Sequence, residues 1–447
     1  MYFARAVGAD VLGAYFLFLA YYSIIALITD GGFGIAAIKR ISEGEEANAY
    51  FSAFFILRSV FITTILILML SFRSIFVDLD NAGVFLWLLV ALFVSLFHGT
   101  ISNGIAGCGK IGVSSTAGFL GSALQLSVQI VAVFLGYGVA GLIGGFLLGA
   151  LAGAIIQLRF FDLRIVTFGW KHLKSLSSFS FWSFLVSSGG LVFTHSDTVM
   201  IGYYMSTADV GIYRVIFQFT SIAGFATNAL YITLWPRVSR WNQIGETKLI
   251  EKSLSTALTY SLIMSLPIFV GGALLGDKLL YYFYGEVFMN NTTLTLLLMV
   301  QIVNVFQFFL TAYLSAMNQV REASKITLVS VIANIMLNAA LIPLIGISGA
   351  AIATLATMTL NAVIAWRILA RTINLLLEPN VLLNILKASI AMGIFIGGYL
   401  LFVPISNVWM ALVAVVLGGI IYGAMILKYN RNIYEEMKEI MFKLSRI

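Results

Sequence analysis

The sequence predicts an all-α protein that crosses a membrane many times, and three observations support this fold class. Apolar residues make up 60% of the 447 residues and charged residues 10%, against about 45–50% and about 25% in soluble domains. The mean hydropathy is +1.00. The apolar residues also gather in stretches of about 20, the length at which an α-helix crosses the hydrocarbon core. An ordinary cytosolic enzyme, a disordered chain and a secreted disulfide-rich scaffold are therefore excluded.

Thirteen apolar stretches are long enough to span the membrane, and short loops join them. None of the loops is long enough to hold a separate soluble domain. In chain order, the predicted spans are 11–33, 49–70, 83–105, 112–135, 138–160, 177–204, 210–235, 254–276, 292–316, 323–344, 347–369, 382–403 and 408–428.

The basic residues predict which loops face the cytoplasm. With the loops assigned alternately and the C-terminus inside, 21 of the 26 Lys and Arg residues fall in inner loops and three, Arg5, Arg73 and Lys278, in outer ones. Lys and Arg concentrate in the cytoplasmic loops of membrane proteins, so this asymmetry sets the orientation. It also accounts for the formal net charge of +7 without a nucleic-acid partner.

This orientation places the start of the chain on the outer side, without a span before it. An odd number of spans with an inner C-terminus puts Met1 outside, and residues 1–10 are neither a signal peptide nor a full span. We therefore expect one further helix before Met1, which would give fourteen spans with both ends in the cytoplasm. The alternative is a protein of thirteen spans with an outer N-terminus.

The chain repeats itself. Residues 9–15, Ala-Asp-Val-Leu-Gly-Ala-Tyr, resemble residues 208–213, Ala-Asp-Val-Gly-Ile-Tyr, at an offset of 198 between their final tyrosines. The quartets Gly-Val-Ala-Gly at 138–141 and Gly-Ile-Ser-Gly at 346–349 match at an offset of 208. With the preceding helix included, each unit has six spans and enters the membrane from the same side, as parallel repeats do in several transporter folds. The repeat predicts two six-helix lobes around a central cavity.

The repeat divides the chain into four expected parts. The first lobe takes residues 1–160, with most of its first helix missing, and the second takes 161–376. Residues 377–429 add two transmembrane helices outside the repeat. The tail, 430–447, places its apolar residues on one helical face and its basic residues elsewhere, which is typical of an amphipathic helix on the inner membrane surface.

Cysteine and histidine usage argues against metal or redox chemistry. The one cysteine, Cys108, rules out an intrachain disulfide. Histidines at 98, 172 and 195 are too few and too scattered for a zinc site. A G-x-x-x-x-G-K-[ST] phosphate loop is absent from the sequence, and no loop has room for an ATPase domain. We expect no metal, no cofactor and no catalytic residue.

Several short motifs follow one another in a fixed order along essentially the whole chain. Ala4-Arg5-Ala6-Val7-Gly8…Gly13-Ala14-Tyr15 is similar to A-R-x-x-G…G-x-Y, and Asp30-Gly31-Gly32-Phe33-Gly34…Lys39-Arg40 to D-x-G-x…R. Asp197-Thr-Val-Met-Ile-Gly202 is similar to D-x-x-x-x-G, and Pro-Arg-Val-Ser at 236–239 and Tyr-Gly-Glu-Val-Phe at 284–288 also fit. Together they resemble the O-antigen and polysaccharide flippases of the multidrug/oligosaccharidyl-lipid/polysaccharide superfamily. The chain departs from that family at its start, since family members have a complete first helix.

The resemblance implies a flippase rather than an enzyme. Its cargo would be an oligosaccharide linked through phosphate or pyrophosphate to a polyprenyl lipid, moved from the cytoplasmic to the outer leaflet by alternating access between the lobes. Energy would come from an ion gradient or the membrane potential. The resemblance also implies a monomer in the cell membrane, in contact with membrane lipid and the lipid-linked oligosaccharide. Glycosyltransferases and a polymerase of the same pathway would be its neighbours, and nucleic acid would not be a partner.

Arg58 is the first candidate for binding the cargo. It lies nine residues into its span, about 13 Å deep at 1.5 Å per residue. A charge at mid-membrane costs roughly 2.5–3.5 kcal/mol on insertion scales. An unpaired guanidinium there can bind a phosphate with its planar fork. The alternative is an arginine that snorkels to the inner leaflet.

Other charged candidates lie near the predicted outer surface. Arg5 either contacts the lipid phosphate near its release or anchors the chain to outer headgroups. Asp197 and Arg214 lie on consecutive spans and form either a latch between the lobes or a structural ion pair. Arg214 is also a candidate substrate contact, and Asp197 a candidate site for a proton or a sodium ion.

The remaining candidates are polar groups inside the spans. His98 and His195 are either proton relays or hydrogen-bonded packing residues, and Asp30, near the inner edge, is a candidate for ion coupling or gating. A polar stripe in the second lobe either contacts sugar or joins neighbouring helices. The stripe comprises Asn304, Gln307, Asn334, Asn338 and Asn361.

Two other functions compete with the flippase. A drug/cation antiporter of the same superfamily would need a buried acidic residue near mid-membrane in the first lobe. Asp30 lies near the inner edge instead, and Arg58 favours an anionic cargo. A membrane polysaccharide polymerase or ligase would need catalytic groups on sizeable outer loops. The outer loops carry little beyond Arg73, Asp78, Asp80, Asp277, Lys278 and Glu286.

Overall fold

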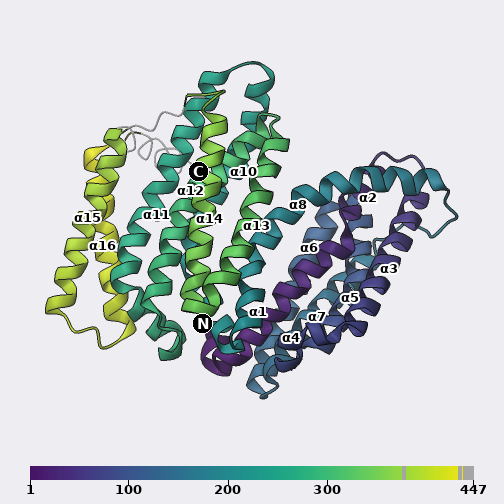
Figure 1. Ribbon diagram of the computed structural model, residues 1–447, viewed down its shortest axis with the longest axis horizontal. Helices are drawn as coiled ribbons and strands as arrows, with labels where there is room; N and C mark the ends of the chain where they lie inside the picture. The colour runs from purple at the N-terminus through teal and green to yellow at the C-terminus, as the bar shows by residue number, and fades with distance from the viewer. Residues whose placement is uncertain (375–378, 431–434, 436–447) are drawn as a thin grey trace. The chain divides into compact units, whose positions relative to one another are not determined.

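The computed structural model describes residues 1–374, 379–430 and 435, except for the side chains at 179, 181–183 and 185–189. These residues form α-helices joined by short turns, and no β-strand occurs among them (Figure 1). The predicted all-α class is confirmed. The amphipathic helix predicted for 430–447 falls almost entirely outside the described residues.

Contacts between helices divide the chain into two units, residues 1–211 and 212–447. The first unit contains α1 (Tyr2–Asp30), α2 (Phe33–Ser42), α3 (Ala47–Ser71), η1 (Arg73–Ile75), α4 (Val77–Asn81), α5 (Phe85–Gly107), α6 (Ile111–Phe134), α7 (Gly138–Leu158) and α8 (Trp170–Tyr204). Helix α9 (Thr207–Ser221) crosses the division. The second unit continues with η2 (Ile222–Gly224), α10 (Phe225–Gln243), α11 (Thr247–Tyr284), η3 (Glu286–Phe288), α12 (Asn291–Ala316), α13 (Val320–Ile345), α14 (Ile347–Leu369), α15 (Pro379–Phe402) and α16 (Val408–Tyr429).

Twelve helical segments among the described residues are long and apolar enough to cross a membrane. They coincide with twelve of the thirteen predicted spans, and α9, η2 and α10 together form one of them. The remaining predicted span, 177–204, falls inside α8, which includes the side chains left out above. Helices satisfy their own backbone hydrogen bonds, as a lipid environment requires. The chain is therefore a multi-pass membrane protein.

The first helix begins earlier than the predicted first span. Residues from Tyr2 onward are helical, but Gly8 interrupts the helix with φ 78° and ψ 178°. Glycine adopts a positive φ without the steric cost of a Cβ atom. Gly8 thus divides α1 into a short helical segment before it and a long one after it.

A second glycine break separates α1 from a short helix that the hydropathy pattern does not predict. Gly31 and Gly32 both have positive φ, 55° and 78°, so the chain turns sharply after Asp30. The ten residues of α2 are too few to cross the membrane. Its buried face packs against α3, α5 and α8, while the exposed or partly exposed Lys39 and Arg40 lie in its last turn.

Glycines let α6 and α7 pack closely. A Cβ atom on Gly121 would lie 2.6 Å from the carbonyl oxygen of Gly149, and a Cβ on Gly149 would lie 2.7 Å from that of Gly121. Small residues at such positions allow helix backbones to approach in membranes, where dispersion forces and polar contacts rather than the hydrophobic effect hold helices together.

The two copies of the repeated Ala-Asp-Val segment contact each other within the first unit. Gly13 and Gly211 occupy equivalent positions at the offset of 198. A Cβ atom on Gly13 would overlap the carbonyl group of Thr207, and one on Gly211 would overlap that of Ala9. Thr207 also donates a hydrogen bond from its hydroxyl to Asp10. The repeat therefore carries a reciprocal glycine contact between α1 and the start of α9.

The division between the units differs from the predicted boundary at 160/161. Helix α8 packs on α1, α2 and α3 and so groups with the N-terminal helices. The helices predicted to lie outside the repeat, α15 and α16, pair with each other and lie on α11 (Figure 1). Their contact is apolar and includes Leu275, Ile385, Met392 and Tyr422.

Candidate functional site

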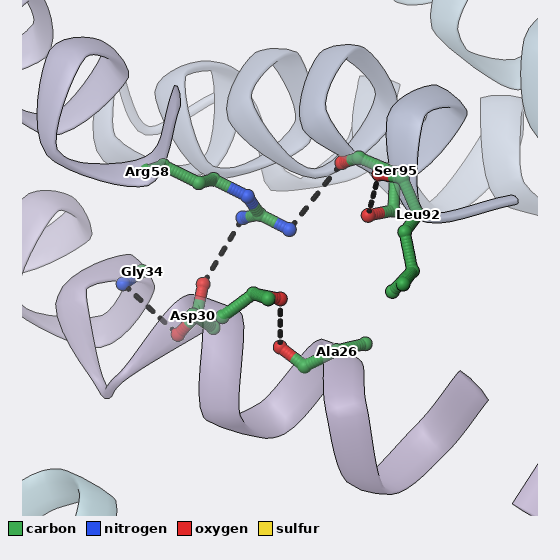
Figure 2. A network of polar contacts seen from close by, with 7 residues as sticks. Ala26, Asp30, Gly34, Arg58, Leu92 and Ser95 are labelled. Atoms are coloured by element: carbon green, nitrogen blue, oxygen red, sulfur yellow. Dashed lines mark hydrogen bonds and ion pairs between the residues drawn. The ribbon is translucent and has the colours of Figure 1, made fainter. Parts of the chain in front are cut away.

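A charged cluster lies inside the first unit, centred on Arg58. Its side chain is 7% exposed. Nη1 donates to Asp30 Oδ1 over 3.0 Å, and Nη2 donates to the backbone carbonyl of Ser95 over 3.3 Å (Figure 2). One guanidinium therefore joins α3 to the end of α1 and to the middle of α5.

Asp30 is held by two helices at once. Besides the ion pair, its Oδ2 accepts the backbone N–H of Gly34 over 3.2 Å, in the first turn of α2 (Figure 2). Unpaired N–H groups and the helix dipole favour a negative charge at a helix N-terminus. The double-glycine turn after Asp30 makes this geometry possible, because it brings α2 back toward the carboxylate. A Cβ atom on Gly34 would lie 2.9 Å from Asp30 Oδ1.

The cluster leaves little free space around the guanidinium. A Cβ atom on Gly99 would overlap it. The ring of Phe54 lies on another side, with its centroid 5.9 Å from the guanidinium carbon. The Arg58 Nε atom is buried without a hydrogen-bond partner in the described structure. An unused donor of this kind costs free energy unless another acceptor approaches.

The prediction that Arg58 is an unpaired cation is wrong, because Asp30 neutralises it. These residues lie 28 apart in sequence on different helices, so no local pattern links them. Snorkelling to the inner leaflet does not describe the residue either, since its side chain is buried among α1, α3 and α5. Breaking a buried pair by removing one partner typically costs about 3–5 kcal/mol.

His98 lies on α5, one turn after Ser95, and is half-buried. It borders α7, where a Cβ on Gly153 would lie 3.6 Å from its Nε2 atom. His195 is half-buried on α8, and Asp197 on the same helix is 5% exposed. Arg5 is exposed in the short segment before Gly8. The proposed roles of these residues stay predictions.

In the second unit, the predicted polar stripe separates into two groups. Asn334 and Asn338 are fully buried, and Asn338 Nδ2 donates to Asn334 Oδ1 over 3.0 Å. Asn361 Nδ2 donates to Ser330 Oγ over 3.1 Å and so joins α14 to α13. This burial favours the helix-joining alternative for the three asparagines. Asn304 and Gln307, on α12, are only partly buried.

Arg214 lies in the second unit, in α9. Its guanidinium carbon lies 5.2 Å from the centroid of the Phe217 ring, one turn further along the helix. Asp197 belongs to the first unit, and its pairing with Arg214 stays a prediction.

A cavity of about 330 Å³ opens between α12 and α14. Its lining is apolar apart from Thr359 and Arg367. No group of three His, Cys, Asp or Glu side chains suited to a metal ion occurs among the described residues.

Sequence analysis does not identify two members of the Arg58 cluster, the backbone carbonyl of Ser95 and the backbone N–H of Gly34. Ser95 contributes its backbone carbonyl, which no side-chain pattern reveals. The hydroxyl of Ser95 instead donates to Leu92 in its own helix (Figure 2). Gly34, which holds Asp30 through its N–H, is visible only as part of the short Asp-Gly-Gly-Phe-Gly motif.

Comparison with known proteins yields a family and a fold. A family model described as polysaccharide biosynthesis protein matches residues 2–292. A relative from Haloferax volcanii, named probable low-salt glycan biosynthesis flippase Agl15, is 25% identical over 447 residues, which cover 99% of this chain and 93% of the relative.

Two solved structures are similar over most of the chain. The lipid II flippase MurJ, in an inward closed conformation, aligns with a TM-score of 0.75 at 18% identity, over 97% of this chain and 98% of MurJ. An inward-facing multidrug resistance MATE family transporter of the MOP superfamily aligns with a TM-score of 0.68 at 16% identity, over 83% of this chain and 93% of that transporter. The predicted fold class is confirmed.

Proposed function

Since the chain belongs to the polysaccharide biosynthesis protein family, we propose that it is a flippase for a saccharide carried on a lipid phosphate. The proposed cargo is an oligosaccharide on a polyprenyl phosphate or pyrophosphate, moved from the cytoplasmic to the outer leaflet. Two likenesses support this function: Agl15 is named a probable glycan biosynthesis flippase, and MurJ, a lipid II flippase, has a similar fold.

The buried cation Arg58 carries the proposal. A lipid phosphate is an anion, and a cation well inside the apolar part of the protein can stabilise it there. Arg58 suits this role because its guanidinium can form two parallel hydrogen bonds to phosphate oxygens. Its present partner is itself an anion, so a phosphate can replace Asp30 without leaving the guanidinium unpaired.

In this proposal, the phosphate approaches Arg58 from the side on which Asp30 lies and replaces Asp30 as its partner. The side chain of Asp30 is 25% exposed, against 7% for Arg58, so a phosphate can approach the pair where the carboxylate lies. The phosphate would take the Nη1 donor that Asp30 occupies in the structure. Asp30 would keep the N–H of Gly34, or take up a proton. Proton uptake by the displaced carboxylate would link cargo binding to an ion gradient.

In this proposal the two predicted lobes, residues 1–160 and 161–376, alternate between facing the cytoplasm and facing outside. Arg5 and Arg214 remain candidate contacts for the phosphate, and Asn304 and Gln307 for the sugar. The glycosyltransferases and polymerase of the same pathway remain the proposed neighbours of a monomeric flippase.

The antiporter alternative keeps one supporting observation, the fold likeness to a multidrug resistance transporter. It requires an acidic residue free to bind a cation. Asp30 is the candidate, and Arg58 already neutralises its charge. This pairing favours an anionic cargo over a cationic one.

The test uses three variants: Arg58→Gln, Asp30→Asn and the two combined. Each single change leaves one buried charge unpaired and should lower the melting temperature. The double variant has no unpaired charge and should fold like the wild type. It should nevertheless flip the cargo about 10–100-fold more slowly, since one charged hydrogen bond contributes roughly 1.5–3 kcal/mol. The measurement is the rate at which lipid-linked oligosaccharide reaches the outer leaflet of reconstituted vesicles.

Arg73→Gln is the matched control. Arg73 also pairs with an aspartate, Asp80, but its side chain is 53% exposed and lies between spans. Its loss should leave flipping unchanged. Flipping by the double variant at the wild-type rate would show that the Arg58–Asp30 pair only joins helices.

A further inference from the structure

A second aspartate is buried in the first unit, in the short helix α4 between the spans α3 and α5. Asp78 is 7% exposed. The hydroxyl of Tyr21, on α1, donates to its Oδ2 atom over 2.8 Å. The other carboxyl oxygen, Oδ1, is buried and has no hydrogen-bond partner in the described structure. The carboxyl group is thus removed from water but only half satisfied.

The surroundings of Asp78 supply no counter-charge. Among the described residues, Asp78 takes part in no salt bridge. The nearby cation, Arg73, donates to both carboxylate oxygens of Asp80 instead, over 2.8 Å to Oδ2. Helix α4 packs on α1 and α8. Within the described part of the chain, the titratable groups at this site are Tyr21, which donates to Asp78, and Tyr203, which interacts with Tyr21; neither is a cation.

These contacts make the ionised form of Asp78 unfavourable. A buried carboxylate without a cation loses its hydration and regains only the hydrogen bond from Tyr21 and interactions with the backbone N–H groups of Asp78 and Leu79. Burial raises the pKa of the Asp78 carboxyl, and the hydrogen bond from Tyr21 offsets part of that effect. When protonated at Oδ2, the carboxyl can donate to the Tyr21 oxygen over the same distance. The unpartnered Oδ1 is then a neutral carbonyl oxygen, which is cheaper to bury than a charged one.

We propose that Asp78 is a proton-binding site that docks α4 onto α1 through Tyr21. The bound proton removes the charge that would otherwise oppose burial of α4. Helix α4 is short, and its buried residues are Asp78 and Leu79. Ionisation of Asp78 therefore affects one of the two side chains that hold α4 in place. Loss of the proton favours release of α4 from α1.

The sign of the pH dependence follows from this arrangement. The folded chain binds the proton more tightly than the unfolded chain, in which aspartate has a pKa of about 3.9. Docking is therefore complete at low pH and weakens as the pH rises through the raised pKa of Asp78. The exposed ion pair of Asp80 should show the opposite trend, because Arg73 lowers the pKa of that carboxyl.

The test is an infrared titration of the full-length protein in lipid, from about pH 4 to about pH 8, which begins near the ordinary aspartate pKa. Neutral carboxylic acids have a carbonyl band that carboxylates lack. We expect one such band to persist above the ordinary aspartate range. Asp78→Asn should remove it, since asparagine imitates the neutral acid in size and hydrogen bonding. Asp80→Asn, two residues away in the same helix, is the matched control and should retain it.

A third variant keeps the test independent of the folding of Asp78→Asn. Tyr21→Phe removes the hydroxyl that stabilises the charged form, so the band should persist to a higher pH than in the wild type. A band that survives in Asp78→Asn would overturn the assignment. So would a titration midpoint in the ordinary range that does not move in Tyr21→Phe. Neither measurement depends on the identity of the transported cargo.

Discussion

Arg58 joins three helices through a single side chain. Substitution with lysine tests whether its charge or the geometry of its guanidinium matters. Its Nη1 and Nη2 atoms reach Asp30 and Ser95, which lie on opposite sides of the guanidinium. A lysine at this position keeps the charge but concentrates it in one ammonium group, which cannot reproduce a planar fork. Charge and geometry can therefore be separated by substitution.

We predict that Arg58→Lys folds nearly as well as the wild type but flips the cargo more slowly. The ammonium can still pair with Asp30, which preserves most of the stability. It cannot hold the phosphate with two parallel bonds, so the activity should fall between that of the wild type and that of the Arg58→Gln/Asp30→Asn variant. Melting temperature and the flipping rate in vesicles measure the two effects. A lysine variant with full activity would mean that only the charge matters.

Glu46 is an ion-paired residue outside the spans, and it lies where α3 and α8 begin. Lys171 Nζ lies 2.7 Å from the Glu46 carboxylate, and His172 Nε2 lies 3.1 Å from it. The backbone N–H of Gly169 lies 3.0 Å from His172 Nδ1, and the Nε2 atom of the same ring faces Glu46. Chiefly through the hydrogen bond from Lys171, and then that from His172, the pKa of Glu46 is lowered.

We predict that this contact loosens in acid. The pKa of Glu46 is lower in the folded protein than its unfolded value of about 4.3. Its contribution to stability is therefore present above that pH and is lost as the pH falls through the lowered pKa. Hydrogen exchange of the amides near residues 46 and 170 should quicken over this range in the wild type. Glu46→Gln should abolish that pH dependence, while Glu45→Gln, at an exposed neighbour, should retain it.

At the scale of helices, glycine placement decides which pairs can approach closely. On α7, a Cβ atom at Gly149 would meet Gln125 and Gly121 of α6 within 3 Å, at 2.6 Å and 2.7 Å. At Gly144, on the same helix, no atom would lie within 4 Å of an added Cβ. Gly149 therefore faces the neighbouring helix at close range, whereas Gly144, five residues earlier, has open space beside it.

We predict that Gly149→Val destabilises the protein and Gly144→Val does not. Overpacking of a close helix contact typically costs about 1–3 kcal/mol. Valine at an unobstructed helical position should change stability by no more than about 0.5 kcal/mol. Thermal unfolding of both variants in the same detergent gives the comparison. Equal melting temperatures would mean that α6 and α7 do not approach through Gly149.

Helix α2 illustrates what hydropathy alone overlooks at this scale. Its ten residues are too short for a span, so a search for membrane-length stretches passes over it. Two consecutive glycines with positive φ both end α1 and begin α2, and Asp30 lies directly before them. The functional interest of this turn comes from the carboxylate, which contacts both α2 and α3.

For the whole molecule, the distribution of basic residues predicts which ends of the helices face the cytoplasm. We predict that cysteines placed at Lys171 and Lys248 are protected in intact cells, while cysteines at Asn81 and Lys278 react with an impermeant thiol reagent. Cys108 is exposed and must be replaced first. Asn81 is preferable to Asp78 as an outer position because Asp78 is buried. Labelling at 171 but not at 278 would reverse the assigned orientation.

The helical class, the positions of twelve spans and the family can be predicted from the amino-acid sequence. Each of these depends on local properties. A span is a run of apolar residues, and its length follows from the thickness of the hydrocarbon core. The family motifs are short stretches read in order. Even the reciprocal contact of Gly13 and Gly211 has a local signal, since the repeated Ala-Asp-Val segment contains both.

The pairing of the polar residues within the spans depends instead on how the helices pack together. Sequence analysis singled out both Arg58 and Asp30 but treated Arg58 as unpaired and did not link the two residues. It left open whether Asn334 and Asn338 contact sugar or join helices, and the structure shows both fully buried and bonded to each other. It assigned Asp78 to an outer loop but did not reveal that this aspartate is buried against Tyr21 of α1. An apolar span specifies that a helix crosses the membrane but not its rotation or its neighbours. Those depend on packing between helices that are distant in sequence, and this packing determines whether a polar side chain meets a partner, lipid or cargo.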